Sequence, residues 1–167
     1  MVYNILELLY SEFTKGGGCM AGEFSVPLSK IVDTLHLNKV YLAENYEDIN
    51  ITTMEINRPG LELTGYFEFF DEKRIQIIGK AEESFLANFI PEKAKKRVED
   101  LFSHKPSAVV VCRNLDIPET FIEFAEKYDV PLFRTSVSTS SFSSALIAFL
   151  NVNLAPRITR HGVLVEV

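Results

Sequence analysis

The sequence contains few of the residues that build metal centres and disulfide frameworks. Its 167 residues include two cysteines, Cys19 and Cys112, and three histidines. Two cysteines make no disulfide framework, and with three scattered histidines they do not complete a four-ligand metal site. We therefore expect no metal site. The expected compartment is the cytosol.

The sequence also lacks an excess of basic residues and a long apolar run. Seventeen Lys and Arg stand against 23 Asp and Glu, which gives a formal net charge of −6. Binding to nucleic acids and to anionic membranes depends on clustered basic side chains. No apolar run approaches the length that crosses a bilayer. Neither a nucleic acid nor a membrane is therefore an expected partner.

The motifs of common catalytic sites are missing as well. The sequence has no GxxxxGK[ST] or GxGxxG phosphate loop, no His-Glu-x-x-His zinc motif and no GxSxG nucleophile elbow. We therefore predict no catalytic residue. On their chemistry alone, the residues favour a binding or regulatory module.

What is present is an alternation of strand-like and helix-like segments. The apolar content of 47% and the charged content of 24% are typical of one globular domain. The run AVVVC at 108–112 is continuously apolar, as expected for a strand buried on both faces of a parallel sheet. The pattern predicts an α/β fold, a three-layer α/β/α sandwich with a mostly parallel sheet. Strands are expected at 49–56, 75–78, 108–112, 130–134 and 163–167, and helices at 2–13, 28–35, 60–70, 82–90, 91–102, 119–128 and 142–150.

Three glycines at 16–18 separate the first helix from the rest of the chain. We interpret residues 1–19 as an N-terminal helix followed by a flexible joint. Met20 is an alternative start, in which case residues 1–19 are a leader or a cloning remnant. Residues 20–160 then form the main domain, and 161–167 form a strand that leads toward a further domain.

The segment from 55 to 79 carries the first group of candidate ligand-binding residues. Arg58 precedes Pro59 and Gly60, and Arg74 precedes the apolar strand at 75–78. Arginines at junctions beside a glycine can hold an anion through paired hydrogen bonds. In the simpler interpretation, Pro59 and Gly60 begin a helix and both arginines are solvated.

A second candidate region follows the strand at 130–134. Arg134 is followed by Thr135, Ser136 and six further Ser or Thr residues before position 145. Hydroxyl groups and free N–H groups at a helix start can bind a phosphate or carboxylate. The alternative is that these residues cap the helix and fill a turn. In open α/β sheets, ligands bind beyond the carboxyl ends of the strands. Residues 57–60 and 134–144 are expected there, and Arg113-Asn114 after AVVVC is a weaker third candidate.

The order of several motifs resembles one family. RPGLELTGYF (58–67), RIQIIG (74–79), SFLANFIP (84–91), AVVVCR (108–113), VPLFRTSVSTS (130–140) and HGVLVEV (161–167) are similar to the N-terminal domain of bacterial HPr kinase/phosphorylase. The resemblance covers the chain from about Met20 onward. It implies a fold like that of the substrate-binding N-domain of the Mur ligases, an analogy that transfers no ligand.

The resemblance also implies a function. Members of this family phosphorylate a serine of HPr, the phosphocarrier of the sugar phosphotransferase system, and remove that phosphate again. ATP and Mg are expected only in the family's C-terminal catalytic domain, and no cofactor is expected in this chain. The implied partners are HPr, the chain's own kinase domain and further copies of itself, because the family's proteins are hexamers.

Three functions therefore compete. In the first, the chain is the regulatory or assembly domain of an HPr serine kinase/phosphorylase, within a longer protein or encoded alone. Alternatively, it is a stand-alone module that binds an anion, a sugar phosphate or a nucleotide-sugar through the candidate residues. The third possibility is an unrelated doubly wound enzyme, which the missing phosphate loops disfavour.

Overall fold

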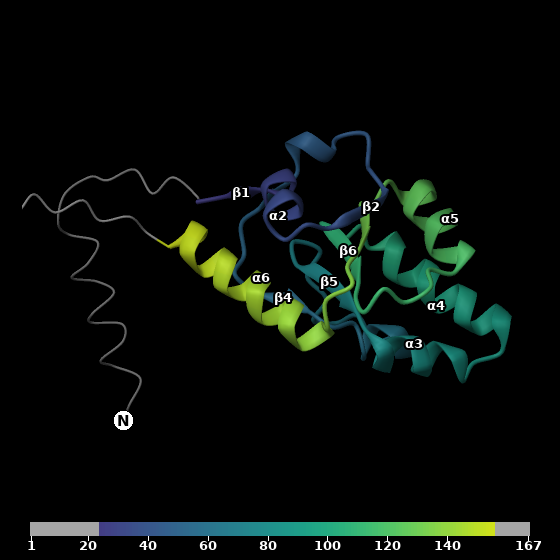
Figure 1. The fold of residues 1–167 in the computed structure, drawn as a ribbon. Helices are drawn as coiled ribbons and strands as arrows, with labels where there is room; N and C mark the ends of the chain where they lie inside the picture. Colours follow the sequence, from purple (N-terminus) through teal and green to yellow (C-terminus); the bar gives the residue numbers. More distant parts are fainter. Residues whose placement is uncertain (1–23, 156–167) are drawn as a thin grey trace, which may run out of the picture.

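A five-stranded sheet forms the centre of the protein in a computed structural model that describes residues 24–155 (Figure 1). The strand order is β2-β7-β6-β5-β4. Strands β4 to β7 are parallel to one another, and β2 pairs antiparallel with β7. The strands are β2 (Asn38–Tyr41), β4 (Ile56–Asn57), β5 (Ile75–Ile78), β6 (Ala108–Val111) and β7 (Leu132–Arg134). A separate two-stranded sheet pairs β1 (Val26–Pro27) antiparallel with β3 (Asn50–Ile51).

Helices cover both faces of the large sheet. Strands β5 and β6 are buried at every position, so each face of this central pair needs a cover. Helices α2 and α6 share one apolar core with the sheet, and α4 and α5 share the other (Figure 1). The α-helices are α2 (Leu28–Thr34), α3 (Lys80–Ala87), α4 (Pro91–Ser103), α5 (Glu119–Tyr128) and α6 (Thr139–Leu154); the 3₁₀ helices are η1 (Tyr46–Asp48) and η2 (Glu62–Thr64).

Most of the predicted elements are confirmed. The α/β fold with a mostly parallel sheet is present, and the strands expected at 75–78 and 108–112 are β5 and β6. The helix predicted from Pro91 is α4, with Pro91 at its first position, where a missing N–H costs nothing. The final long helix is α6, and Ser138 caps it by accepting a hydrogen bond from the Ser141 N–H.

The helix predicted at 60–70 is wrong. Only the short 3₁₀ helix η2 forms there, and it ends at Gly65, whose φ of 102° is left-handed. This left-handed backbone turns the chain away from a helical path, and the absent Cβ leaves room for the Arg97 guanidinium of α4 beside it. Beyond the turn, Phe67 stacks on His104 with ring centroids 4.1 Å apart, and Tyr66 is 44% exposed.

The single strand predicted at 49–56 is also wrong. The structure divides it into β3 and β4, which belong to different sheets. The antiparallel strand β2 was not predicted. Tyr41 Oη donates a hydrogen bond to Asp129 Oδ1 at 2.9 Å, which ties the end of β2 to the end of α5. The helix predicted at 2–13 and the strand predicted at 163–167 lie outside the described residues.

The helices give no indication of a membrane span. Between residues 24 and 155, none is both long enough and apolar enough to cross a bilayer.

The close packing at Gly79 gives a first prediction. A Cβ on Gly79 would collide with Thr139 Oγ1, and Thr139 is only 6% exposed at the start of α6. Because the backbone of Gly79 lies in an extended conformation that alanine adopts, the cost of Gly79→Ala is steric. We expect a loss of about 1–3 kcal/mol of unfolding free energy, measured by urea denaturation.

Gly60→Ala is the matched control for this substitution. A Cβ on Gly60 would meet no heavy atom closer than 4.0 Å. We expect its urea midpoint to stay near that of the unchanged protein. Equal midpoints for the two alanine variants would contradict the proposed collision at Gly79.

Candidate functional site

The carboxyl ends of the parallel strands meet at one edge of the sheet. Arg58, Gly79, Cys112 and Thr135 directly follow β4, β5, β6 and β7, respectively. Helix α3 begins beside Gly79, and α6 begins four residues after Thr135. This edge is where parallel α/β sheets bind ligands, because loops and helix N-termini converge there. We call these four residues and the two helix starts the carboxyl edge.

Arg58 is held at the carboxyl edge by Glu82 of α3. Its Nη2 donates to both carboxylate oxygens of Glu82, at 2.8 and 2.9 Å. The same carboxylate accepts the Gly79 N–H at 2.8 Å, which caps the first turn of α3. The Glu82 side chain is 6% exposed, whereas that of Arg58 is 47% exposed. The arginine therefore neutralises a buried carboxylate on one side and faces solvent on the other.

A tightly packed group joins the ends of β5 and β6 to α6. The absence of a side chain at Gly79 lets Thr139 of α6 approach the strand end. Cys112 is fully buried in the same region. Burial raises the pKa of the Cys112 thiol to about 11, partly offset by a hydrogen bond with Thr139 and by the nearby charges of Arg58 and Arg113. The thiol is therefore protonated and unreactive at neutral pH.

The loops after β6 and β7 are tied together by backbone hydrogen bonds. Arg113 and Asn114 both have positive φ angles, of 63° and 52°. Their N–H groups donate to the carbonyls of Val137 and Thr135 at 2.9 and 2.8 Å. The Thr135 hydroxyl accepts the Val137 N–H at 3.2 Å. Thr135 thus closes the turn after β7, and Ser138 caps α6, so part of the Ser/Thr run has a structural role.

A group of buried and half-buried polar side chains links β4, η2 and β5. Asn57 Nδ2 donates to Glu62 Oε1 at 2.9 Å and to Gln76 Oε1 at 2.8 Å. Gln76 is fully buried, and its Nε2 donates to the Arg74 carbonyl at 3.1 Å. Because each amide is satisfied by a defined neighbour, this network fixes the path of the loop from β4 to η2.

The structure separates the six predicted ligand-binding residues into groups. Arg58 and Gly60 lie in the loop after β4, where the Gly60 N–H donates to the Arg58 carbonyl at 2.7 Å. Thr135 and Ser136 follow β7; the first is buried and the second is exposed. Both pairs belong to the carboxyl edge.

Arg74 lies away from this group. It directly precedes β5, at the opposite end of the strand from Gly79, and it forms ion pairs with Glu55 and Asp71. Strand alternation places Arg134 on the sheet face opposite that of Thr135. The Arg134 side chain is half-buried, and its Nε has no hydrogen-bond partner among the described residues.

One residue of the carboxyl edge, Glu82, was missed by the sequence analysis, which included Thr139 in the Ser/Thr run and named Arg113 as a weaker candidate. Glu82 had a detectable signal, because it stands three residues after Gly79 in the spacing of a capping box. Its pairing with Arg58, 24 residues away in the chain, had none. Across the described part of the chain, no group of three His, Cys, Asp or Glu side chains could hold a metal ion.

Comparison with known proteins identifies the family. The sequence profile described as "HPr Serine kinase N terminus" matches residues 26–150. The chain belongs to this family. The matched range covers nearly all of the described fold, from β1 into α6.

Curated relatives of this HPr serine kinase N-terminal region are named HPr kinase/phosphorylase. The protein of Caldicellulosiruptor bescii is 42% identical over 144 residues, which cover 86% of this chain and 46% of the relative. The protein of Lachnoclostridium phytofermentans is 40% identical over 144 residues, covering 86% and 47%. That of Lactococcus lactis subsp. lactis is 35% identical over 143 residues, covering 86% and 46%. The chain thus spans about half the length of these relatives.

A solved structure shares the fold of this N-terminal region. It contains the CBS and DRTGG domains of the regulatory region of Clostridium perfringens pyrophosphatase, complexed with the activator diadenosine tetraphosphate. The match has a TM-score of 0.51 and 20% identity, and it covers 72% of this chain and 45% of the other. At this identity the likeness concerns the fold alone.

The pairing of Arg58 with Glu82 is open to a double-mutant cycle. Arg58→Ala leaves a buried carboxylate without its cation, so we expect it to destabilise the fold more than Glu82→Gln, which keeps an oxygen to accept the Gly79 N–H. Because Arg58 is half-exposed, the coupling free energy should be about 1 kcal/mol, measured by chemical denaturation.

The exposed pair Lys95 and Glu123 provides the control cycle. Both side chains are 49% exposed, and their charged atoms are 2.8 Å apart. Solvent screening should leave little measurable coupling there. A coupling for Arg58 and Glu82 no larger than this control would show that the pair does not stabilise the edge.

Proposed function

We propose that this chain acts as the non-catalytic N-terminal region of a bifunctional HPr serine kinase/phosphorylase in carbon catabolite control. The family match over residues 26–150 carries this proposal. The relatives extend to about twice the matched length, and they bear the name of the whole enzyme. The proposed roles of the region are regulation of the kinase and assembly of its subunits.

The proposal assigns phosphorylation and dephosphorylation of HPr to the C-terminal half of such an enzyme. ATP and Mg would bind to the C-terminal catalytic domain, and HPr would be the substrate there. The partners of this chain would be its own kinase domain and further copies of itself, up to the hexamer of the family, in the bacterial cytosol. We also propose that the two helical layers and the sheet correspond to the three-layer sandwich of the Mur ligase N-domain, a fold analogy without a shared ligand.

A deletion experiment tests this function. The 167-residue chain, incubated with HPr, ATP and Mg, should transfer no phosphate to HPr. A full-length relative such as the Caldicellulosiruptor bescii protein should still phosphorylate HPr after deletion of the region equivalent to 26–150. Compared with the unchanged enzyme, the deletion variant should differ in its oligomeric mass, measured by light scattering, or in the response of its kinase activity to metabolites.

Two outcomes would contradict the proposal. The first is phosphorylation of HPr by the 167-residue chain itself. The second is a deletion variant whose assembly and metabolite response both equal those of the unchanged enzyme.

A second candidate function is the binding of an anionic metabolite, such as a sugar phosphate, at the carboxyl edge. One observation favours it: Arg58 follows β4 and Arg113 follows Cys112 at the end of β6, so two positive charges lie at the carboxyl ends of parallel strands on either side of β5. Exposed Ser136 and the start of α6 add hydrogen-bond donors there. Glu82 already neutralises part of this charge.

Calorimetry with glucose 6-phosphate tests this candidate. Saturable binding is expected, and Arg58→Ala and Arg113→Ala should each weaken it by about tenfold, the cost of one charge-assisted hydrogen bond. Arg74→Ala is the matched control, because Arg74 lies at the opposite end of β5 and should leave the affinity unchanged. Full affinity in both the Arg58 and Arg113 variants would exclude the carboxyl edge as the site.

A further inference from the structure

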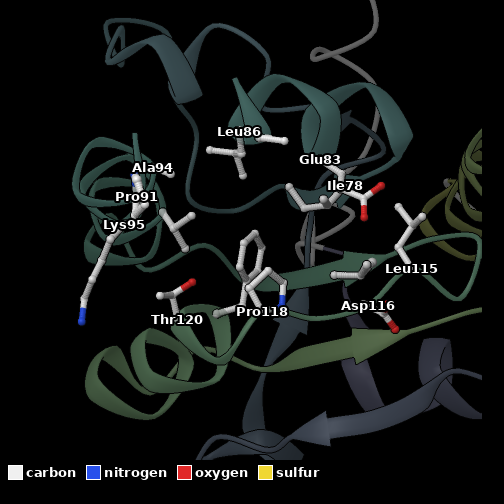
Figure 2. Close-up of a pocket in the computed structure, with 14 residues that line it drawn as sticks. Ile78, Glu83, Leu86, Pro91, Ala94, Lys95, Leu115, Asp116, Pro118 and Thr120 are labelled. Carbon is white, nitrogen blue, oxygen red and sulfur yellow. The ribbon is translucent and has the colours of Figure 1, made fainter. Parts of the chain in front are cut away.

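A pocket opens on the α3, α4 and α5 side of the sheet, beyond the ends of β5 and β6 (Figure 2). Its volume is about 340 Å³. None of the candidate residues identified from the sequence lines it. The volume is at the lower end of the range of small-molecule sites, which is roughly 300–1,000 Å³. The pocket therefore suits a compact ligand.

The inner wall of the pocket is apolar. Its side chains come from both strand ends and from all three helices: Ile78, Leu86, Val98, Val111, Leu115 and Phe121. Two alanines, Ala87 of α3 and Ala94 of α4, line the space where larger side chains would fill it. Burial of an apolar group there would contribute most of the binding free energy.

The rim of the pocket is acidic. Glu83 of α3 and Asp116 of the loop after β6 both line it. Neither carboxylate forms an ion pair with any residue that the structure describes. In Figure 2 the two carboxylates lie on the same side of the pocket, with Leu115 beside them. An apolar cavity with unpaired negative charge at its mouth is complementary to an apolar molecule that carries a positive charge.

Lys95, the cation that lines the pocket, does not neutralise this rim. Its amine extends away from the centre of the pocket (Figure 2). Lys95 Nζ lies 2.8 and 3.0 Å from the two carboxylate oxygens of Glu123, on the outer face of α5. Thr120 supplies a hydroxyl group to the lining but no charge. The charge at the mouth is therefore set by Glu83 and Asp116.

We propose that this pocket binds a compact apolar molecule bearing one ammonium group. The apolar body occupies the space beside Leu86 and Phe121, and the ammonium group lies at the rim near Glu83 and Asp116. The proposal concerns a different ligand and a different face of the sheet from the anion candidate at the carboxyl edge. It stands or falls independently of the HPr kinase assignment.

Three probes of equal shape and different charge test the proposal. They are 3-phenylpropylamine, 3-phenylpropan-1-ol and 3-phenylpropanoate, titrated into the ¹⁵N-labelled 167-residue chain at neutral pH and followed by amide chemical shifts. The amine should bind about three- to tenfold more tightly than the alcohol, and the carboxylate should bind most weakly. The shifted amides should cluster around Leu86, Ala94 and Phe121.

Two variants separate shape from charge. Ala94→Phe fills the pocket and should abolish binding of the amine, whereas Ala148→Phe, at an exposed position of α6 on the other side of the sheet, should leave binding unchanged. The double variant Glu83→Gln with Asp116→Asn should bind the amine and the alcohol equally. Its substitutions replace a half-buried and an exposed carboxylate by amides of the same shape, so it tests the proposal even if Ala94→Phe fails to fold.

Several results would overturn the proposal. One is that the carboxylate probe binds as tightly as the amine. Another is that the preference for the amine survives in the double variant, or that the shifted amides lie on another surface. Absence of binding by all three probes up to about 10 mM would also overturn it, and would leave the pocket to an apolar side chain of a partner protein.

Discussion

The fold depends on the complete burial of the central parallel strands β5 and β6. Because all eight of their residues are buried, both faces of the sheet must be covered by helices, with α2 and α6 on one side and α4 and α5 on the other. Parallel pairing then brings the carboxyl ends of β4 to β7 to one edge. The position of the candidate site is thus a consequence of how the core is buried.

The two sides of this edge are built differently. Toward α6, Gly79 allows Thr139 to approach the strand end, and Cys112 is fully buried there, so this side is tightly packed. Toward α4 and α5, Ala87 and Ala94 leave the space that becomes the apolar pocket. Small residues therefore serve opposite purposes on the two sides: a glycine permits close packing on one, and alanines prevent it on the other.

Local sequence patterns correctly predicted the helices and strands that their own residues determine. They failed for segments whose conformation depends on contacts with residues far away in the chain. The run AVVVC and Pro91 were sufficient to locate β6 and α4. The apolar spacing at 60–70 indicated a helix, but Gly65 adopts a left-handed φ with the Arg97 side chain packed beside it, and no local signal reports that contact. Arg58 was found as a candidate because it follows a strand, whereas its partner Glu82 depends on how α3 is placed. Predicting the site therefore required the tertiary structure.

Helix α3 connects the two candidate sites physically. Glu82 faces the carboxyl edge and binds Arg58, while the next residue, Glu83, lines the apolar pocket. A ligand in the pocket can change the carboxyl edge only if α3 has two alternative placements and the protein binds the ligand more tightly in one of them. The capping of Gly79 by Glu82 and the packing of Gly79 against Thr139 both oppose movement of the first turn of α3. Any coupling between the sites must therefore arise at the other end of this helix, where Leu86 and Ala87 line the pocket.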